Sequence, residues 1–258
     1  MFYIIDIRPI QRILSFTRKA IEDYGMISQN DRIAIGVSGG KDSVALLCAM
    51  TTLSRFYPKK FEVVPITIGM GYTDENFDNI TEICDVLGLN LNCFPTEIHK
   101  IVFEVRKEKN PCSLCANLRR GALNNAAINL SCNKVALAHH FDDTVETFYM
   151  NLFNEGRIDC FSPVTYLDRK NITVIRPFIY LPEKKIKRFI RASGITPSQK
   201  YCPADQNTDR QRVKHILAEL EKKDRGVKAR LFKAIEKSGV GGFKVHPKRK
   251  SNTRKEEL

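Results

Sequence analysis

Short apolar runs alternate with longer helical patterns through the first two thirds of this chain, and this alternation limits the possible folds more than any other feature. The runs typical of buried strands are Arg32 to Val37, Phe61 to Ile68, Leu89 to Phe94 and Lys134 to Ala138. The helical patterns are Val44 to Leu53, Glu75 to Leu87 and Asp142 to Phe153. Strands separated by helices need crossover connections, which place them parallel in one sheet with both faces covered. The sequence therefore predicts an α/β fold with a parallel sheet.

An N-terminal helix and a basic C-terminal region flank the predicted sheet. Apolar residues recur at helical spacing from Ile10 to Tyr24, and Gly25 follows as a stop signal. After Arg176 and Pro177 the chain becomes helical and basic, and its last residues are charged with few large apolar groups, which is typical of disorder. We therefore divide the chain into an N-terminal helix (1–28), a sheet domain (29–177), a basic helical region (178–243) and a disordered basic tail (244–258).

The charge balance favours a polyanionic partner. The 258 residues contain 42 Lys and Arg against 29 Asp and Glu, a formal net charge of +13. Such a surplus is typical of nucleic-acid binding, because each cation on a phosphate releases counterions; a generally basic proteome is the alternative. No run of ~18 apolar residues is present, so the sequence predicts no membrane span, and we expect no membrane partner. No signal-peptide pattern begins the chain. We expect a cytoplasmic protein whose eight cysteines are thiols or metal ligands rather than disulfides.

The segment Ser38-Gly39-Gly40-Lys41-Asp42-Ser43 lies between a predicted strand and a predicted helix. Two glycines let the backbone approach a ligand, its N–H groups converge on an anion, and the helix N-terminus adds positive potential. The lysine and both serine hydroxyls can complete a phosphate cradle, and the aspartate can hold Mg²⁺. The Walker pattern is excluded, since no glycine lies five residues before the Gly-Lys pair. An ordinary glycine-rich turn needs neither the Lys-Asp pair nor both serines, so we predict a phosphate-binding loop.

Three cysteines are candidate ligands of a metal or a cluster. Cys112 and Cys115 form a CxxC, whose two sulfurs can share one metal or cycle as a redox pair. There is no second CxxC, and the further candidate is Cys202, in a polar loop. Three cysteines suit a [4Fe-4S] cluster with one iron free of protein ligands; a zinc site completed by a histidine is the alternative. The cysteines expected to be structural are Cys48, Cys84, Cys93, Cys132 and Cys160.

These motifs, in this order, resemble the tRNA 2-thiocytidine synthetase family, commonly called TtcA, among the PP-loop ATP pyrophosphatases. The likeness runs from the stretch at Arg18 to Tyr24 through SGGKDS, PCSLC with LRRG, HHFDDTVET and IRPF to Cys202. Ala138 stands where the family usually has Gly, and Cys202 is alone where some members carry a second CxxC. The resemblance implies a Rossmann-like, adenine nucleotide α-hydrolase-like PP-loop domain with a helical C-terminal region. It also implies ATP, Mg²⁺, a [4Fe-4S] cluster on Cys112, Cys115 and Cys202, and tRNA cytidine 32 as target.

The segment His139-His140-Phe141-Asp142-Asp143 follows a predicted strand and opens a predicted helix. Asp142 and Asp143 can serve as caps in the first helical turn. The end of a parallel strand is also where ligand sites lie in open α/β sheets. We favour a site role in which His140 and Asp143 organise Mg²⁺ and pyrophosphate, while the separate role of each residue stays open.

Five basic residues are candidates for tRNA binding: Arg119, Arg120, Lys184, Lys185 and Arg188. The first two follow the CxxC, and the other three lie on the polar face of a predicted helix from Glu183 to Ala192. Either group can instead be a set of solvated surface charges. The concentration of basic residues in the last third of the chain favours an RNA-facing surface.

The implied reaction divides the chain into an activating half and a sulfur-delivering half. Transfer of AMP to the cytosine C2 oxygen creates a good leaving group, with Lys41, Asp42 and Asp143 as catalytic residues and Mg²⁺ stabilising the phosphates. Sulfide on the open iron then replaces AMP. The ATP-binding residues would be Ser38, Gly39, Gly40, Lys41, Asp42, Ser43 and His140. The expected partners are tRNA and a cysteine desulfurase or other sulfide donor, and a homodimer is a possible assembly.

Three other functions stay open at this point. A lysidine synthetase is a PP-loop tRNA enzyme that needs no CxxC. A TtuA-type uridine thiolase carries additional terminal CxxC pairs, which this sequence lacks. A zinc-stabilised nucleotide- and RNA-binding module without turnover would use the same cysteines for zinc.

Overall fold

The computed structural model describes residues 8–107, 111–198 and 209–246. Six strands in this part of the chain form one sheet in the order β3-β2-β1-β4-β6-β5. They are β1 (Asp31–Gly36), β2 (Phe61–Ile68), β3 (Asn92–Phe94), β4 (Lys134–Ala136), β5 (Val164–Leu167) and β6 (Ile172–Ile175). All neighbouring strands are parallel except β5, which pairs antiparallel with β6. The predicted parallel sheet is confirmed, and the β5–β6 hairpin adds an edge that was not predicted.

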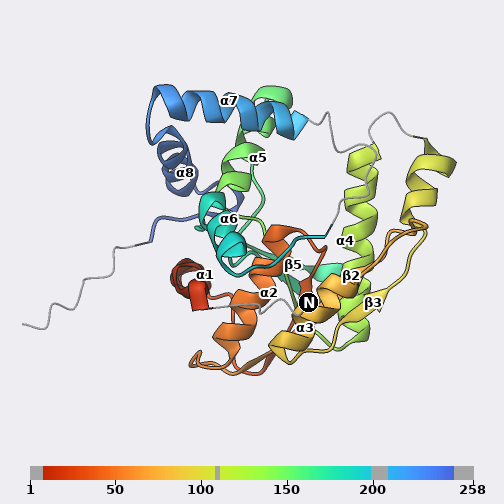
Figure 1. The fold of residues 1–258 in the computed structure, drawn as a ribbon. Coiled ribbons are helices and arrows are strands. Elements are labelled where there is room, and N and C mark those ends of the chain that lie inside the picture. Colours follow the sequence, from red (N-terminus) through yellow and green to blue (C-terminus); the bar gives the residue numbers. More distant parts are fainter. Residues whose placement is uncertain (1–7, 108–110, 199–208, 247–258) are drawn as a thin grey trace, which may run out of the picture.

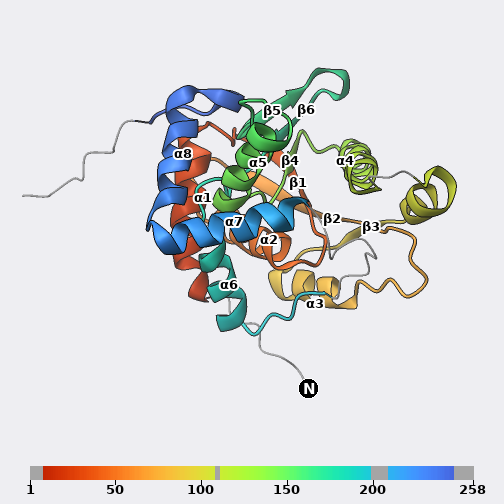
Figure 2. The same ribbon diagram turned by 90° about the horizontal axis from the view of Figure 1, so that it is seen from above.

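Helices cover both faces of the sheet, with α4 on one face and α1, α2 and α6 on the other (Figures 1 and 2). The helices are α1 (Gln11–Asp23), α2 (Lys41–Ser54), α3 (Asp78–Leu87), α4 (Pro111–Asn129), α5 (Phe141–Asn154), α6 (Glu183–Ala192), α7 (Asp209–Lys223) and α8 (Val227–Ser238). A π-helical segment, Lys100–Arg106, precedes α4. Within the described ranges, no helix combines the length and apolarity needed to cross a membrane.

The central strand β1 is buried on both faces, which explains its continuous apolar run. Ile33 and Ile35 point into the core shared with α1 and α2, whereas Ala34 points into the second core beneath α4. At the end of β1, a side chain on Gly36 would place its Cβ 2.7 Å from Leu123 of α4. Glycine at this position lets α4 pack closely against the carboxyl end of the strand, where the phosphate loop begins.

The order of the strands creates a crevice between β1 and β4. From β1 the chain passes outward to β2 and β3, whereas from β4 it passes to the opposite side, toward β6 and β5. β1 and β4 are themselves neighbours. Ligands of open α/β sheets bind at such a switch point, outside the carboxyl ends of the strands. Both motifs with predicted phosphate chemistry follow these two strands.

The C-terminal helices pack against the sheet domain. α6 lies on α1 and α2, while α7 and α8 lie on α5. One apolar cluster includes Ile13 of α1, Leu46 of α2, Ile186 of α6 and Phe232 of α8. The predicted helix from Glu183 to Ala192 is confirmed with these bounds. The basic region is thus held at the phosphate-binding edge by an apolar core.

Four of the cysteines expected to be structural are buried: Cys48, Cys84, Cys132 and Cys160. The expectation for Cys93 as a small core residue was wrong, because β3 is an edge strand and its thiol is exposed. Cys202 and residues 247–258 of the predicted tail lie outside the described residues.

Candidate active site

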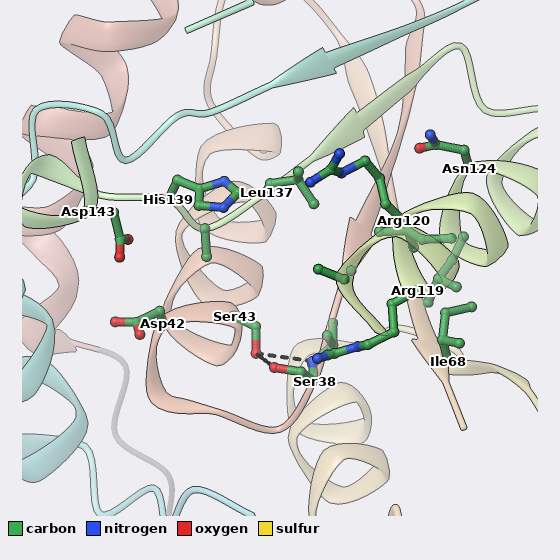
Figure 3. A pocket seen from close by; sticks show the side chains of 16 residues that line it. Ser38, Asp42, Ser43, Ile68, Arg119, Arg120, Asn124, Leu137, His139 and Asp143 are labelled. Carbon is green, nitrogen blue, oxygen red and sulfur yellow. Dashed lines mark hydrogen bonds between the residues drawn. The ribbon is translucent and has the colours of Figure 1, made fainter. Parts of the chain in front are cut away.

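A pocket of about 370 Å³ opens at the carboxyl ends of β1 and β4. Its size is in the range of small-molecule sites. Figure 3 shows Asp42 and Asp143 on one side of the pocket, while Arg119 and Arg120 extend into it from α4 on the other side. Apolar side chains also line the pocket, among them Ile66, Ile68, Leu123 and Leu137. The pocket therefore combines carboxylates on one side, guanidinium groups on the other and apolar side chains in its wall.

Ser43 fixes the shape of the phosphate loop. Its Oγ accepts the Ser38 N–H at 3.2 Å and donates to the Gly40 carbonyl at 2.9 Å. Gly40 is the N-cap of α2 and provides no side-chain cap, so the first N–H groups of the helix are open to an anion. Gly39 has a φ of +76°, and a Cβ there would lie 2.3 Å from Ser198 Oγ. Only glycine fits this position.

Lys41 and Asp42 form the charged part of the loop. Lys41 Nζ lies 2.7 Å from Asp42 Oδ2 and 3.0 Å from Glu183 Oε1. Burial alone would lower the pKa of Lys41, but these two carboxylates outweigh burial and raise it, so the ammonium stays charged. Asp42 Oδ1 is buried and has no hydrogen-bond partner among the described residues. It lies 3.8 Å from His140 Nε2, and this arrangement leaves one carboxylate oxygen available to a cation.

The segment at the start of α5 divides its two aspartates between different tasks. Asp143 forms a reciprocal capping box with His140, with Asp143 N–H donating to His140 Nδ1 and His140 N–H donating to Asp143 Oδ2. Asp142 instead accepts the Glu183 N–H at 2.8 Å and the Lys228 ammonium at 3.0 Å. Asp142 therefore ties α6 and α8 to α5, whereas Asp143 caps its own helix and lines the pocket.

The two histidines also differ. His140 is buried in the cap, whereas His139 lines the pocket. Burial and the nearby Arg176 guanidinium lower the pKa of His139 to about 3, which keeps its imidazole neutral. Its ring lies 4.8 Å from the Phe161 ring, and the Arg176 guanidinium lies 5.1 Å from the same ring. Arg176 of the Ile-Arg-Pro-Phe motif is thus a buried cation close to His139. The sequence did not indicate this role.

Two buried glutamates near the site were not predicted as functional. Glu146 lies in α5, with 2% of its surface exposed, and its Oε1 has no hydrogen-bond partner in the described part of the chain. Burial and the charge of Asp143 raise the pKa of Glu146 to about 7. Glu183, at the start of α6, contacts Lys41 of the phosphate loop. The sequence offered one weak indication of a role for these two residues. Glu146 occurs at a buried position of α5, and Glu183 is an acidic residue at the start of the basic helix α6.

The CxxC lies on the helix that supplies the two pocket arginines. Cys112, in the first turn of α4, is exposed, and Cys115, at the start of the second turn, is partly buried. Cys112, Ala116 and Arg119 are spaced four and three residues apart, so they share one helix face, and the last two line the pocket. Cys112 is therefore about two helical turns from Arg119, which lines the pocket.

The third expected ligand, Cys202, lies outside the described residues. Before it in the chain, the Ser198 N–H donates to the Gly39 carbonyl at 3.0 Å, and after it Arg210 Nη1 lies 3.1 Å from Asp143 Oδ1. Ser198 therefore contacts the phosphate loop, and Arg210 contacts a carboxylate that lines the pocket. Over the described ranges, no group of three His, Cys, Asp or Glu side chains is arranged to hold a metal ion.

The predicted tRNA-binding residues fall into two separate groups. Arg119 and Arg120 line the pocket (Figure 3). Lys184 and Arg188 are exposed on α6, and neither lines the pocket. Lys185 Nζ lies 5.2 Å from the Phe16 ring centre on α1, which is a packing contact within the protein.

Known proteins resemble this chain in sequence and in fold. A family model described as a PP-loop domain matches residues 10–221. Relatives named tRNA-cytidine(32) 2-sulfurtransferase include one from Pelobacter propionicus, 36% identical over 241 residues, which span 92% of this chain and 87% of the relative. Another, from Geotalea daltonii, is 40% identical over 230 residues, spanning 87% and 90%. Among solved structures, the U34-tRNA thiolase NcsA from Methanococcus maripaludis with its [4Fe-4S] cluster has a TM-score of 0.71 at 23% identity, covering 87% of this chain and 77% of that one. This last likeness shows the fold.

Proposed function

Because this chain belongs to the tRNA-cytidine(32) 2-sulfurtransferase family of PP-loop proteins, we propose that its pocket binds ATP and activates a tRNA cytidine for sulfur insertion. The observation that carries this proposal is the shared pocket. The phosphate loop after β1 and the helix that begins with the CxxC both open onto it. An enzyme that activates an oxygen and then replaces it needs both functions within reach of one atom.

The phosphates of ATP would bind at the start of α2. The open N–H groups of the first turn, the hydroxyls of Ser38 and Ser43 and the ammonium of Lys41 surround this position. The raised pKa of Lys41 keeps its charge during turnover. The apolar wall that includes Ile68 offers a surface for the base.

The residues of the site fit a magnesium ion. Mg²⁺ in phosphate sites is usually held by one or two carboxylates together with phosphate oxygens and water. Asp42 presents a buried oxygen without a hydrogen-bond partner among the described residues, and Asp143 lines the same pocket. These two carboxylates would hold the ion, which would neutralise charge on the phosphates.

Adenylation would proceed at the loop. The cytosine C2 oxygen forms a bond to the α-phosphorus, and the bond to the bridging oxygen breaks with release of pyrophosphate. Lys41 and the N–H groups at the start of α2 stabilise the negative charge that develops on the leaving pyrophosphate. Arg119 and Arg120, at the other end of the pocket, would neutralise phosphates of the bound tRNA.

The donor set fits an iron–sulfur cluster. Cys112 and Cys115 lie near the start of α4. We assign Cys202 as the third ligand, because Ser198 before it contacts Gly39 of the phosphate loop and Arg210 after it contacts Asp143. When bound, such a cluster supplies a sulfur nucleophile that replaces the activated oxygen. Each turnover consumes one sulfur, so a sulfide donor such as a cysteine desulfurase is a required partner. Because its substrate would be a tRNA, we infer a cytoplasmic location.

Nucleoside analysis tests the proposal directly. Protein prepared without oxygen should convert cytidine to 2-thiocytidine in tRNA when given ATP, Mg²⁺ and sulfide, with pyrophosphate released. Mass spectrometry of tRNA from a deletion strain should show loss of 2-thiocytidine at position 32. Formation of 2-thiouridine instead would identify a uridine thiolase. ATP and tRNA binding without any thiolated product would support a binding module.

A further inference from the structure

The carboxylate of Glu183 lies among three lysine ammonium groups beside the phosphate loop. Its Oε1 is 3.0 Å from the Nζ atoms of both Lys41 and Lys214, and its Oε2 is 3.2 Å from Lys187 Nζ. The side chain is only 10% exposed. Burial opposes its ionisation, but hydrogen bonds from Lys214 and Lys41 outweigh burial and lower the pKa of Glu183 to about 2. The group is therefore a carboxylate throughout the physiological pH range.

The backbone of Glu183 is fixed where α6 begins. Pro182 is the N-cap of this helix and provides no side-chain cap. Asp142 supplies the cap from α5, because its Oδ2 accepts the Glu183 N–H at 2.8 Å, and Lys228 Nζ holds the other carboxylate oxygen at 3.0 Å. Glu183 is thus a fixed anion, and the flexible lysine side chains adjust to it.

Lys41 needs such an anchor. Its other carboxylate partner is Asp42, at 2.7 Å, which is also the residue with the unpartnered oxygen in the pocket. With Asp42 alone, the ammonium would pair with the carboxylate that the bound cation requires. Glu183 provides a second contact from a different helix and holds the ammonium at the loop in a defined position.

We propose that Glu183 is a positioning residue that holds the Lys41 ammonium for transfer of AMP. The inference rests on the proposed adenylation at this loop. Positioning affects the transition state most, because the ammonium must meet the developing charge on pyrophosphate without reorganisation. A change of local charge alone would act on bound ATP and on the transition state to a similar degree, and would therefore alter KM rather than kcat.

Three variants separate position from charge. Glu183→Gln removes the anchor and raises the local charge by one. Lys187→Met lowers the local charge by one and leaves the contact between Glu183 and Lys41 intact, since Lys187 binds the other carboxylate oxygen and is 52% exposed. The double variant restores the original net charge without the anchor. All three are assayed for pyrophosphate release with tRNA, and their thermal unfolding is recorded.

We expect kcat of Glu183→Gln to fall by about 10-fold or more, the value of a charge-assisted hydrogen bond, with a much smaller change in KM for ATP. Lys187→Met should remain close to wild type, and the double variant should be as slow as Glu183→Gln. Recovery of kcat in the double variant, or an unchanged kcat in Glu183→Gln, would overturn the proposal. If Glu183→Gln does not fold, Glu183→Asp takes its place, because it keeps the charge but its shorter side chain moves the carboxylate away from Lys41. A wild-type kcat in Glu183→Asp would also overturn the proposal.

A readout that needs no turnover separates this inference from the proposed function. Lysine side-chain NMR can follow the mobility of the Lys41 ammonium, which Glu183 contacts at 3.0 Å. Loss of this contact in Glu183→Gln should increase that mobility, whereas Lys187→Met should not. Unchanged mobility of the Lys41 ammonium in Glu183→Gln would refute the anchor even if the wild-type protein released no pyrophosphate. Failure of wild-type release together with increased mobility in Glu183→Gln would count against adenylation and leave the anchor in place.

Discussion

The phosphate loop and the proposed cysteine site are built in different ways. The phosphate loop is a single run from Ser38 to Ser43, closed by its own hydrogen bonds and held between β1 and α2. The proposed cysteine site would combine Cys112 and Cys115, near the start of α4, with Cys202, which is distant in sequence and lies outside the described residues. The first is defined by its local sequence, whereas the second depends on how two segments meet.

This difference indicates how each region should respond to substitution. The bonds that close the phosphate loop are made by Ser43, so replacing Lys41 or Asp42 should remove chemistry and leave the shape of the loop unchanged. Ligands contributed by separate segments stabilise one another through the bound group, so each should be needed for the others to hold it. The two regions should therefore fail independently.

The largest expected effect is on the phosphate loop. Lys41→Ala and Asp42→Ala should lower tRNA-dependent pyrophosphate release by at least about 100-fold, because each removes charge stabilisation at the phosphates. Iron content and visible absorbance should stay at the wild-type level. Unchanged release from both variants would reject the phosphate-loop assignment, and parallel loss of iron would show that the two regions are coupled.

The reverse separation is expected for the cysteines. Alanine at Cys112, Cys115 or Cys202 should reduce iron content and 2-thiocytidine formation to background, because a cluster with three protein ligands tolerates no missing thiolate. ATP binding should persist. Cys84→Ala is a matched control, since Cys84 is buried in the core away from the CxxC. Full iron content in Cys202→Ala would remove it from the ligand set, and bound zinc in place of iron would favour the zinc site.

Local patterns predicted most of the sheet domain. β1, β2, α2, α5 and α6 lie where the apolar runs and helical spacing placed them. The β5–β6 hairpin was not predicted, because its strands have four residues each and only β6 is largely buried. α4 was missed as well, since its apolar residues form no regular stripe and its buried positions cluster at Leu123 to Ala127.

The site was predictable in its motifs and not in its contacts. SGGKDS and the His-Asp segment meet at one pocket, as the strand-end rule implies. The division between Asp142 and Asp143 depends on α6 and α8, which are distant in sequence. Glu183 reaches Lys41 only because α6 begins beside α5. Such contacts follow from packing, and spacing along the chain carries no signal for them.

Glu146 is a buried carboxyl group of α5 whose ionisation should make the stability of the protein depend on pH. Its pKa is raised from 4.5 to about 7 by burial and by Asp143. The folded protein therefore binds more protons than the unfolded chain between these values, and this residue's contribution to stability falls as pH rises through that window. Glu146→Gln removes the effect, so the stability of the variant relative to wild type should increase by about 3 kcal/mol from pH 4 to pH 8.

Denaturant unfolding at several pH values measures this difference. Glu82→Gln, at an exposed position of α3, is the control and should give a relative stability that does not change with pH. If the difference in stability between Glu146→Gln and wild type does not change with pH, burial does not oppose ionisation of the Glu146 carboxyl group. Water would then reach this side chain more readily than its burial indicates.

The smallest expected effect concerns the basic face of α6, which lies outside the pocket. If Lys184, Lys185 and Arg188 contact the tRNA backbone, their joint replacement by alanine should weaken binding by about 10-fold and flatten the dependence of log K on log salt. Lys185 already packs on Phe16, so the slope should fall by roughly two contacts rather than three. Lys185→Ala alone should leave the slope unchanged.

Filter binding across a salt series decides between α6 and the pocket arginines. Arg119 and Arg120 point into the pocket, where they would contact only the nucleotides near the target base. Each counterion-releasing contact requires a separate phosphate, so a steep salt dependence needs several exposed cations. Lys184 and Arg188 are exposed on α6, and Arg119 and Arg120 are exposed beside the pocket. Either group can make such contacts, and the salt slopes of the two sets of variants distinguish them. If the α6 variant keeps wild-type affinity and slope while Arg119→Ala and Arg120→Ala lose both, the tRNA is held at the sulfur-delivering side, and α6 is a solvated face that packs on the core.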